Sequence, residues 1–415
     1  MSYFILTHSI KPQGKSIQNQ YTIIDKIIWS TLVPWLLIDS LNGLLINIGL
    51  NLPLSQLYKL AILSLVIISL AKKEKSIVLL FIVIFYLSWY FLYLSIVGAS
   101  FGEPLLLISK FLTLFLLYFY FCDSFRRFPD KAVGYAYRIF SFSMIVFLVN
   151  IIFGLMGYGI PSYGKGQEDL GVKGFFYAGN ELGGVLAVLA PITLYILWKR
   201  IRGFKFIVSY VILISCCLVI GTKTGILVGL ISGIFVPFIL MTRKKRIIFG
   251  ITFILALSVI IVIIINSEFE SIKSIDRWMY FFENGGIGRL IFSGRDTFWD
   301  AQKAEFFNAS FFEKIWGIGP IEKSIEQDHL DTLLIFGYFG LCSAILFFSF
   351  LLVKSFRCIG NNEVVPIVVL SNVLAITISV IAGHIWYSAM ANLYIALANG
   401  IILVKRKDYL FAKIS

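Results

Sequence analysis

Long apolar runs, separated by short polar segments, repeat along almost the whole chain. Each run approaches the roughly 20 residues that an α-helix needs to cross a bilayer core of about 30 Å. The runs cover residues 27–48, 55–71, 76–98, 104–122, 133–157, 177–198, 204–221, 224–241, 247–266, 330–353, 364–385 and 387–404. This pattern predicts an all-α integral membrane protein with about twelve transmembrane helices.

The basic residues predict how these helices are oriented. With the N-terminus in the cytoplasm, the cytoplasmic segments hold 23 of the 36 Lys and Arg residues, counting Lys26 and Lys205 at helix ends. The short outer loops near residues 50, 100 and 386 hold none. Since cytoplasmic loops carry an excess of Lys and Arg, both termini are expected in the cytoplasm. One helix more or fewer would place the basic runs on alternating sides.

Two predicted outer segments are longer than the other loops, at residues 158–176 and 267–329. The second separates the ninth and tenth predicted helices and is the only stretch large enough to fold outside the membrane. We therefore expect residues 1–415 to form one polytopic membrane domain with a large outer loop. Residues 267–328 carry 11 acidic and 7 basic residues, so an anion site in this loop must depend on particular Arg or Lys side chains.

Composition agrees with a lipid environment. Hydrophobic residues make up 59% of the chain and charged residues 14%, against about 45–50% and about 25% in soluble domains. The net charge of +13 follows from the predicted orientation, so it does not indicate a nucleic-acid partner. The basic runs are expected to attract anionic membrane lipids. No metal and no cofactor is expected, since the outer loops lack an Asp-x-Asp motif and the chain lacks a phosphate-binding Walker loop.

Three cations near the outer helix ends are candidates for binding an anion. Lys223 lies in Gly-Thr-Lys-Thr-Gly between two apolar runs, Arg295 in Ser-Gly-Arg-Asp-Thr-Phe-Trp, and Arg289 six residues earlier. The planar guanidinium of arginine can bind a phosphate or carboxylate through two hydrogen bonds. The alternatives are an interfacial lysine whose ammonium reaches the bilayer surface and two solvated loop arginines.

A dense acidic cluster precedes the tenth predicted helix. Glu326, Asp328 and Asp331 lie within six residues of one another, together with His329. If the helix begins near residue 327, Asp328 and Asp331 share a face. The cluster could supply a general base, or its acids could stabilise the helix N-terminus electrostatically.

Asn180 and Glu181 lie at the outer end of the sixth predicted helix, in Ala-Gly-Asn-Glu-Leu-Gly-Gly. The sequence leaves two interpretations of this pair open. The residues cap the helix, or they line a cavity together with Asp331 and the rest of the acidic cluster.

At these residues the sequence resembles the superfamily of O-antigen polymerases and O-antigen ligases. Similar segments are Asn180 to Gly184, Gly221 to Gly225 with Lys223 where the family more often has arginine, and Ser293-Gly294-Arg295 with Trp299. Gly317-Ile318-Gly319 and Glu326-x-Asp328 followed by Gly337-x-x-Gly340 complete the pattern. The order and placement of the motifs, rather than any one of them, carry the resemblance.

The resemblance implies a metal-independent glycosyltransferase in the bacterial inner membrane, with its active site facing the periplasm. Its substrates would be oligosaccharides on undecaprenyl diphosphate, and a chain-length regulator protein is a further expected partner. Ligases of the superfamily tend to carry His eleven residues before the first glycine of Gly-x-x-Gly, where this chain has Glu326, and His329 is three residues out of register. This difference favours a polymerase of O-antigen or capsule over a ligase. A flippase or other secondary transporter is a third interpretation, because its helix count would be the same.

The implied chemistry assigns roles to the candidates. Lys223 and Arg295, with Arg289 second, would stabilise the charge of the leaving diphosphate. Glu326 or Asp328, with His329 as the ligase-like alternative, would take the proton of the acceptor hydroxyl.

Overall fold

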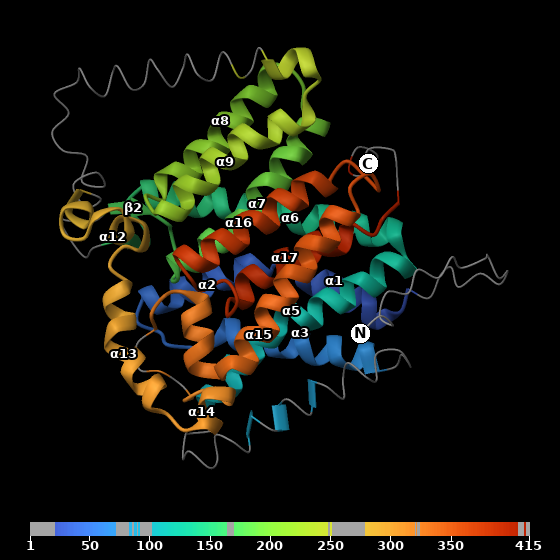
Figure 1. Cartoon of the computed structure of the whole chain (residues 1–415). Coiled ribbons are helices and arrows are strands. Elements are labelled where there is room, and N and C mark those ends of the chain that lie inside the picture. Colours follow the sequence, from blue (N-terminus) through green and yellow to red (C-terminus); the bar gives the residue numbers. More distant parts are fainter. Residues whose placement is uncertain are drawn as a thin grey trace.

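The computed structural model is built almost entirely of helices (Figure 1). It describes residues 21–71, 83–84, 87–88, 90–91, 102–163, 170–247, 250, 279–319, 321, 324–405 and 411. The first helices are α1 (Ile23–Leu32), α2 (Trp35–Asn47), α3 (Leu54–Ala71), α5 (Gly102–Arg127) and α6 (Pro129–Leu155). A two-stranded antiparallel hairpin follows, of β1 (Pro161–Tyr163) and β2 (Leu170–Val172). Next are α7 (Gly179–Arg200), α8 (Phe204–Val219), α9 (Lys223–Leu240), α12 (Gly286–Phe292), α13 (Asp296–Asn308), α14 (Phe311–Trp316), α15 (Asp328–Arg357), α16 (Val365–Ile381) and α17 (Ala389–Ile401).

The helices agree with a polytopic membrane protein. Within the described ranges, six helices are long and apolar enough to cross a membrane: α3, α5, α6, α7, α9 and α15. A seventh span results if α1 and α2 are counted together, because they form a pair bent by 50°. Apolar helices α8, α16 and α17 are shorter, at 10–17 residues. The prediction of an all-α membrane protein is thus confirmed, while the number twelve and the orientation stay predictions.

The predicted spans and the observed helices differ in informative ways. The predicted span 27–48 is broken at Pro34, which lacks the N–H that a continuous helix would use. The span predicted at 247–266 and most of the one at 76–98 lie outside the described residues. Helices α12, α13 and α14 occupy the predicted outer loop 267–329.

Helix α7 is the centre of the bundle. In the most apolar 18-residue stretch of α7, 83% of the residues are buried. The helix packs against α6, α8, α9, α16 and α17. Neighbouring α16 and α17 are joined by a pair of amide hydrogen bonds, from Asn372 to Asn399 at 3.0 Å and back at 2.8 Å. Because both amides are buried, each satisfies polar groups that the apolar interior could not.

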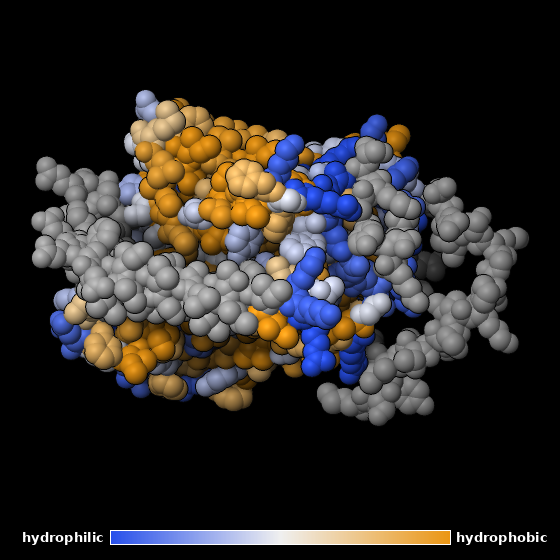
Figure 2. Space-filling model, turned by 90° about the horizontal axis from the view of Figure 1, so that it is seen from above, coloured by the Kyte–Doolittle hydropathy of each residue, from blue (hydrophilic) through white to orange (hydrophobic). Residues whose placement is uncertain are grey.

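The molecule has two chemically different ends. In Figure 2 the coloured part of the face is mostly apolar, and hydrophilic residues gather toward its right-hand end, which is also the right-hand end of Figure 1. At this end α1 is tied to α5, because Arg127 donates to both carboxylate oxygens of Asp25 at 2.9 and 3.0 Å. The opposite end holds the hairpin and α12 to α14 (Figure 1), and the candidate residues of the sequence lie there.

Backbone packing fixes α14 against α15. Gly337, with φ 63°, interrupts α15, and a Cβ there would lie 2.4 Å from the carbonyl carbon of Ile315. Gly317, with φ 97°, is its counterpart, and a Cβ there would lie 2.0 Å from the carbonyl oxygen of Ile335. Between them, the N–H of Ile318 donates to the carbonyl of Leu334 at 2.7 Å. Both glycines of the sequence motif therefore serve one close crossing.

Candidate active site

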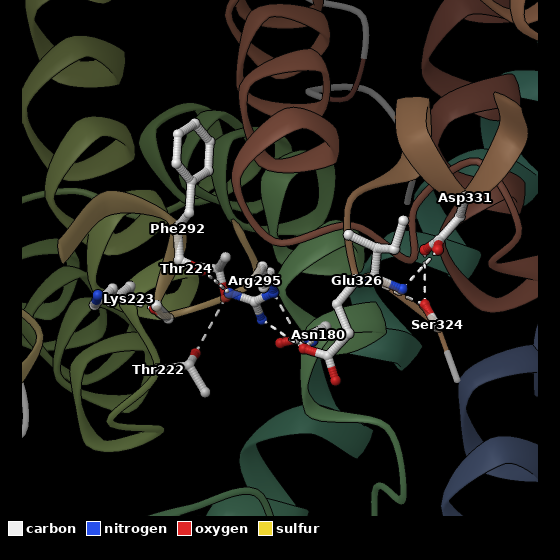
Figure 3. A network of polar contacts seen from close by, with 11 residues as sticks. Asn180, Thr222, Lys223, Thr224, Phe292, Arg295, Ser324, Glu326 and Asp331 are labelled. Atoms are coloured by element: carbon white, nitrogen blue, oxygen red, sulfur yellow. Dashed lines mark hydrogen bonds and ion pairs between the residues drawn. The ribbon is translucent and has the colours of Figure 1, made fainter. Parts of the chain in front are cut away.

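Arg295 and Glu326 form the centre of the candidate site (Figure 3). The Nε and Nη2 atoms of Arg295 donate to Oε2 of Glu326 at 3.1 and 2.7 Å. Asn180, in the first turn of α7, donates to the same oxygen at 3.3 Å. The Arg295 side chain is only 11% exposed, whereas Glu326 is 39% exposed. A buried cation thus holds a carboxylate that remains open to solvent.

The backbone of Glu326 is held in an unusual conformation. Its φ of 62° lies in the left-handed region, which costs a residue with a side chain about 1–2 kcal/mol. The Glu326 N–H donates to Oγ of Ser324 at 3.0 Å. Asp331 accepts from this Oγ at 2.6 Å and from the N–H of Ile325 at 2.7 Å. Asp331 therefore orders the segment that presents Glu326, and Figure 3 shows it on the far side of this carboxylate from Arg295.

The backbone of Gly383 packs against the backbone of Glu326. It has φ 63°, and a Cβ at this position would lie 2.4 Å from the carbonyl carbon of Glu326. Only a residue without a side chain permits this approach of the two backbones. The turn after α16 and the segment before α15 are thus in direct contact.

Asp328 is fully buried and bonded to a different part of the chain from Asp331. Its Oδ2 accepts from the N–H groups of Ile385 and Trp386 at 2.8 and 3.0 Å. Among the described residues its Oδ1 has no hydrogen-bond partner. The two acids therefore accept from different backbone segments, Asp328 from the one before α17 and Asp331 from the one before α15. Neither carboxylate caps the N-terminus of α15.

His329 and Glu181 also lie near the centre. His329 is half-buried in the first turn of α15, and within the described part of the chain its Nδ1 has no hydrogen-bond partner. Glu181 accepts from Oγ of Ser388 at 2.6 Å, which links the start of α7 to the residue that caps α17. Asn180 therefore contacts Glu326, whereas the neighbouring Glu181 contacts Ser388 instead.

Lys223 fastens the start of α9 to the segment that carries Arg295. Its Nζ donates to the carbonyl of Leu290 and, at 2.9 Å, to Oγ of Ser293. It also lies 5.2 Å from the ring centre of Phe281. Lys223 is on the opposite side of Arg295 from Glu326 in Figure 3.

Arg289 is placed apart from this network. It donates to the carbonyl of Asn284 at 3.0 Å, in an exposed contact. Within the described part of the chain, no hydrogen bond or ion pair joins it to the Arg295–Glu326 pair. Of the three predicted cations, Arg295 therefore contacts Glu326 directly, Lys223 contacts the neighbouring residues Leu290 and Ser293, and Arg289 contacts neither group.

An apolar groove opens beside Lys223. Its volume is about 310 Å³, and its lining is almost entirely aliphatic. The lining comes from α9, α12 and α16: Lys223, Thr224, Ile226, Leu227, Leu230, Leu290, Ile291, Ile378 and Ile381. Such a groove stabilises a hydrocarbon chain by removing it from water or by replacing lipid contacts.

In the described part of the chain, no three His, Cys, Asp or Glu side chains are arranged to hold a metal ion. The polar groups that meet at Glu326 are one cation, a partly exposed carboxylate and an amide, and Lys223 is held on the adjoining residues Leu290 and Ser293. They can bind a phosphate-containing group and accept a proton from a hydroxyl.

A comparison with known families matches this chain over residues 55–281 and 282–408 to the model described as O-antigen ligase like membrane protein. The chain belongs to this family. The matched ranges contain Asn180, Lys223, Arg295 and Glu326. A search of curated proteins finds no match. Family membership confirms the sequence resemblance and supports a glycosyltransferase-type enzyme with an O-antigen ligase or polymerase type of activity.

This member of the O-antigen ligase-like family positions its site with residues that the sequence did not single out. Ser324, Gly383 and the amides of Ile385 and Trp386 hold Glu326 and Asp328. Lys173, beyond β2, is 7% exposed and donates to the carbonyl of Tyr177 at 2.8 Å, ahead of α7. Burial lowers the pKa of this ammonium group. For Gly383 the sequence offers one signal, its place beside His384 at the end of the predicted span 364–385, where a glycine is compatible with a sharp turn.

Proposed function

We propose that this chain is a polysaccharide polymerase that joins oligosaccharide repeat units carried on undecaprenyl diphosphate. The repeats are those of an O-antigen or a capsule, and the reaction takes place at the periplasmic face of the inner membrane. The contact between Arg295 and Glu326 supports this proposal most directly. It brings a cation for a leaving diphosphate and a carboxylate for an attacking hydroxyl to one point.

The reaction requires one bond to form and one to break. The acceptor hydroxyl oxygen attacks the anomeric carbon of the donor sugar, and the bond from that carbon to the phosphate oxygen breaks. Glu326 takes the hydroxyl proton, and the electron pair leaves with the lipid diphosphate. Because negative charge develops on the diphosphate, preorganised cations beside an apolar region stabilise the transition state most.

Arg295 has donors left for a phosphate. Of the five N–H groups of a guanidinium, its contacts with the described residues use two toward Glu326 and one toward the carbonyl of Phe292. Lys223 enters from the other side of the 290–295 segment. The apolar groove beside Lys223 suits the prenyl chain of the carrier, so the lipid and its diphosphate would lie along one path.

Replacement of Arg295 tests the proposal. Arg295→Ala should shorten the ladder of long surface polysaccharide chains on a gel, with a fall in polymerisation rate of about 10²–10³-fold, as for loss of one preorganised donor. Arg295→Lys should restore little, because lysine lacks the planar pair of donors. Lys303→Ala is the matched control, since Lys303 pairs with Asp300 on the exposed face of α13 in the same loop. A normal ladder from Arg295→Ala, at a normal protein level, would exclude the diphosphate role.

A ligase that transfers finished polymer to lipid A core is the second candidate. His329 favours it, because this imidazole lies three residues from Glu326 and its Nδ1 has no partner among the described residues. A deletion strain separates the two enzymes. Loss of a polymerase leaves a single repeat on the core, whereas loss of a ligase leaves polymer on the carrier lipid.

The transport interpretation is tested with purified protein. A polymerase makes polymer from lipid-linked repeats in detergent without an ion gradient, whereas a flippase makes none. Co-purification from the native membrane tests the chain-length regulator as a partner.

A further inference from the structure

A polar cavity inside the bundle has no role in the reaction described above. It lies between α2, α3, α5, α7 and the start of α17, and its volume is about 320 Å³. Four charged side chains line it: Asp39, Lys59, Lys110 and Glu181. Charged groups among membrane helices are costly and usually mark a site for a polar ligand.

Two oxygens at this cavity have no hydrogen-bond partner in the described part of the chain, Oδ2 of Asp39 and Oε1 of Gln56. The other carboxylate oxygen of Asp39 accepts from Oγ of Ser55 at 2.6 Å and from Nζ of Lys59 at 2.5 Å. Since buried polar atoms in folded proteins almost always have partners, the two oxygens are acceptors that water or a bound ligand can satisfy.

The cavity adjoins the candidate active site through α7. Asn180 and Glu181 are consecutive residues in its first turn; Asn180 donates to Glu326, and Glu181 lines the cavity. The segment before α17 makes a second connection. Ser388 donates to Glu181, and its neighbours Ala389 and Met390 line the cavity. The first turn of α7 therefore contacts both the cavity and Glu326.

We propose that this cavity binds a sugar ring of the acceptor repeat unit, an assignment that rests on the proposed polymerase function. Hydroxyl groups of a sugar donate to the oxygens of Asp39 and Gln56 and accept from the ammonium groups of Lys59 and Lys110. The volume fits a small ligand, at the lower end of the range of about 300–1,000 Å³ for such sites.

The charges and the aromatic residues favour a sugar over other ligands. Two acids and two lysines cancel formally, so the cavity does not attract a multiply charged anion such as diphosphate. Its polar lining does not suit a prenyl chain, which the groove beside Lys223 accommodates. Phe176 and Tyr177 also line the cavity, and aromatic rings pack against the apolar face of a sugar ring.

Binding of the free glycan tests this site without requiring polymerisation. The probe is the repeat-unit oligosaccharide released from its lipid by mild acid. Its binding to the full-length protein in nanodiscs is followed by saturation-transfer NMR. Gln56→Leu removes one unpartnered oxygen, and Ser109→Phe fills the cavity from α5. Ser64→Phe is the matched control, because Ser64 lies on the exposed face of α3.

We expect the unaltered protein, Ser64→Phe and Arg295→Ala to bind the oligosaccharide alike. Gln56→Leu and Ser109→Phe should bind about tenfold more weakly, as expected for lost hydrogen bonds, while still binding undecaprenyl diphosphate and eluting as folded protein. Equal binding by all variants, or no transfer to the unaltered protein at saturating oligosaccharide, overturns the sugar site. Normal polymer from Arg295→Ala would instead overturn the polymerase mechanism, and the binding result would stand apart from it.

Discussion

Asp328 joins the start of α15 to the segment before α17, and two substitutions measure this connection. Asp328→Ala removes the oxygen that accepts from the N–H groups of Ile385 and Trp386. Both amides would remain in a region where Asp328 itself is fully buried. Asp328→Asn keeps one oxygen that can accept from both amides.

The size of the effect follows from the two amides. A buried donor left without a partner costs about 1–3 kcal/mol, so two give about 2–6 kcal/mol. That loss is a large part of the roughly 5–15 kcal/mol by which proteins are stable. Asp328→Asn should lose a smaller share, because the acceptor remains and only the Oδ1 position changes to a donor.

Thermal unfolding of the purified protein and its rate of polymer synthesis are measured together. We expect Asp328→Ala to unfold at a lower temperature and to lose activity, and Asp328→Asn to retain most of both. Glu326→Gln should instead lose activity while unfolding normally. If Asp328→Asn unfolds like the unaltered protein but makes no polymer, the Asp328 carboxylate takes part in the chemistry. Its structural connection would then not explain the loss of activity.

Three further predictions concern other parts of the molecule. Gly383→Ala should reduce the polymerisation rate strongly, measured beside the unfolding temperature, because its Cβ would displace the backbone of Glu326; a rate near normal would contradict the contact. Leu230→Gln, in the apolar groove, should raise KM for the prenyl-linked donor and leave KM for a short-tailed analogue unchanged; equal effects on both donors would argue against the groove as the lipid site. Asp25→Ala, at the opposite end, should lower stability by about 1–3 kcal/mol, because the hydrogen bonds from Arg127 to Asp25 are lost while Asp123 still pairs with Arg127, and kcat per folded molecule should not change if the two ends act independently.

Hydropathy predicted the helices well because membrane spans must satisfy their own backbone and cover it with apolar side chains. The break at Pro34 was visible in the sequence, but its 50° angle depends on how α1 and α2 pack. The lengths of α8 and α17 were less predictable, since an apolar run continues past the residue where a helix ends.

The candidate residues were found in the sequence, but their partners were not. Arg295 and Glu326 are 31 positions apart, and no helical or strand periodicity connects them. Asp328 and Asp331 looked like one cluster, yet the fold directs them to different segments. Asp39 was visible only as an acid inside an apolar run, because its pairing with Lys59 requires α2 and α3 to lie together.

The crossing of Gly317 and Gly337 has a consequence for recognising other proteins of this design. Neither position accepts a methyl group without moving the opposing backbone. Because the backbones at Gly317 and Gly337 meet, the chain between them must return to its starting point, so the spacing of twenty residues is constrained along with the two glycines. A glycine pair at this separation, with a Glu eleven residues before the second glycine, is therefore a compact signature by which this loop-to-helix joint can be sought in sequences too divergent for overall alignment.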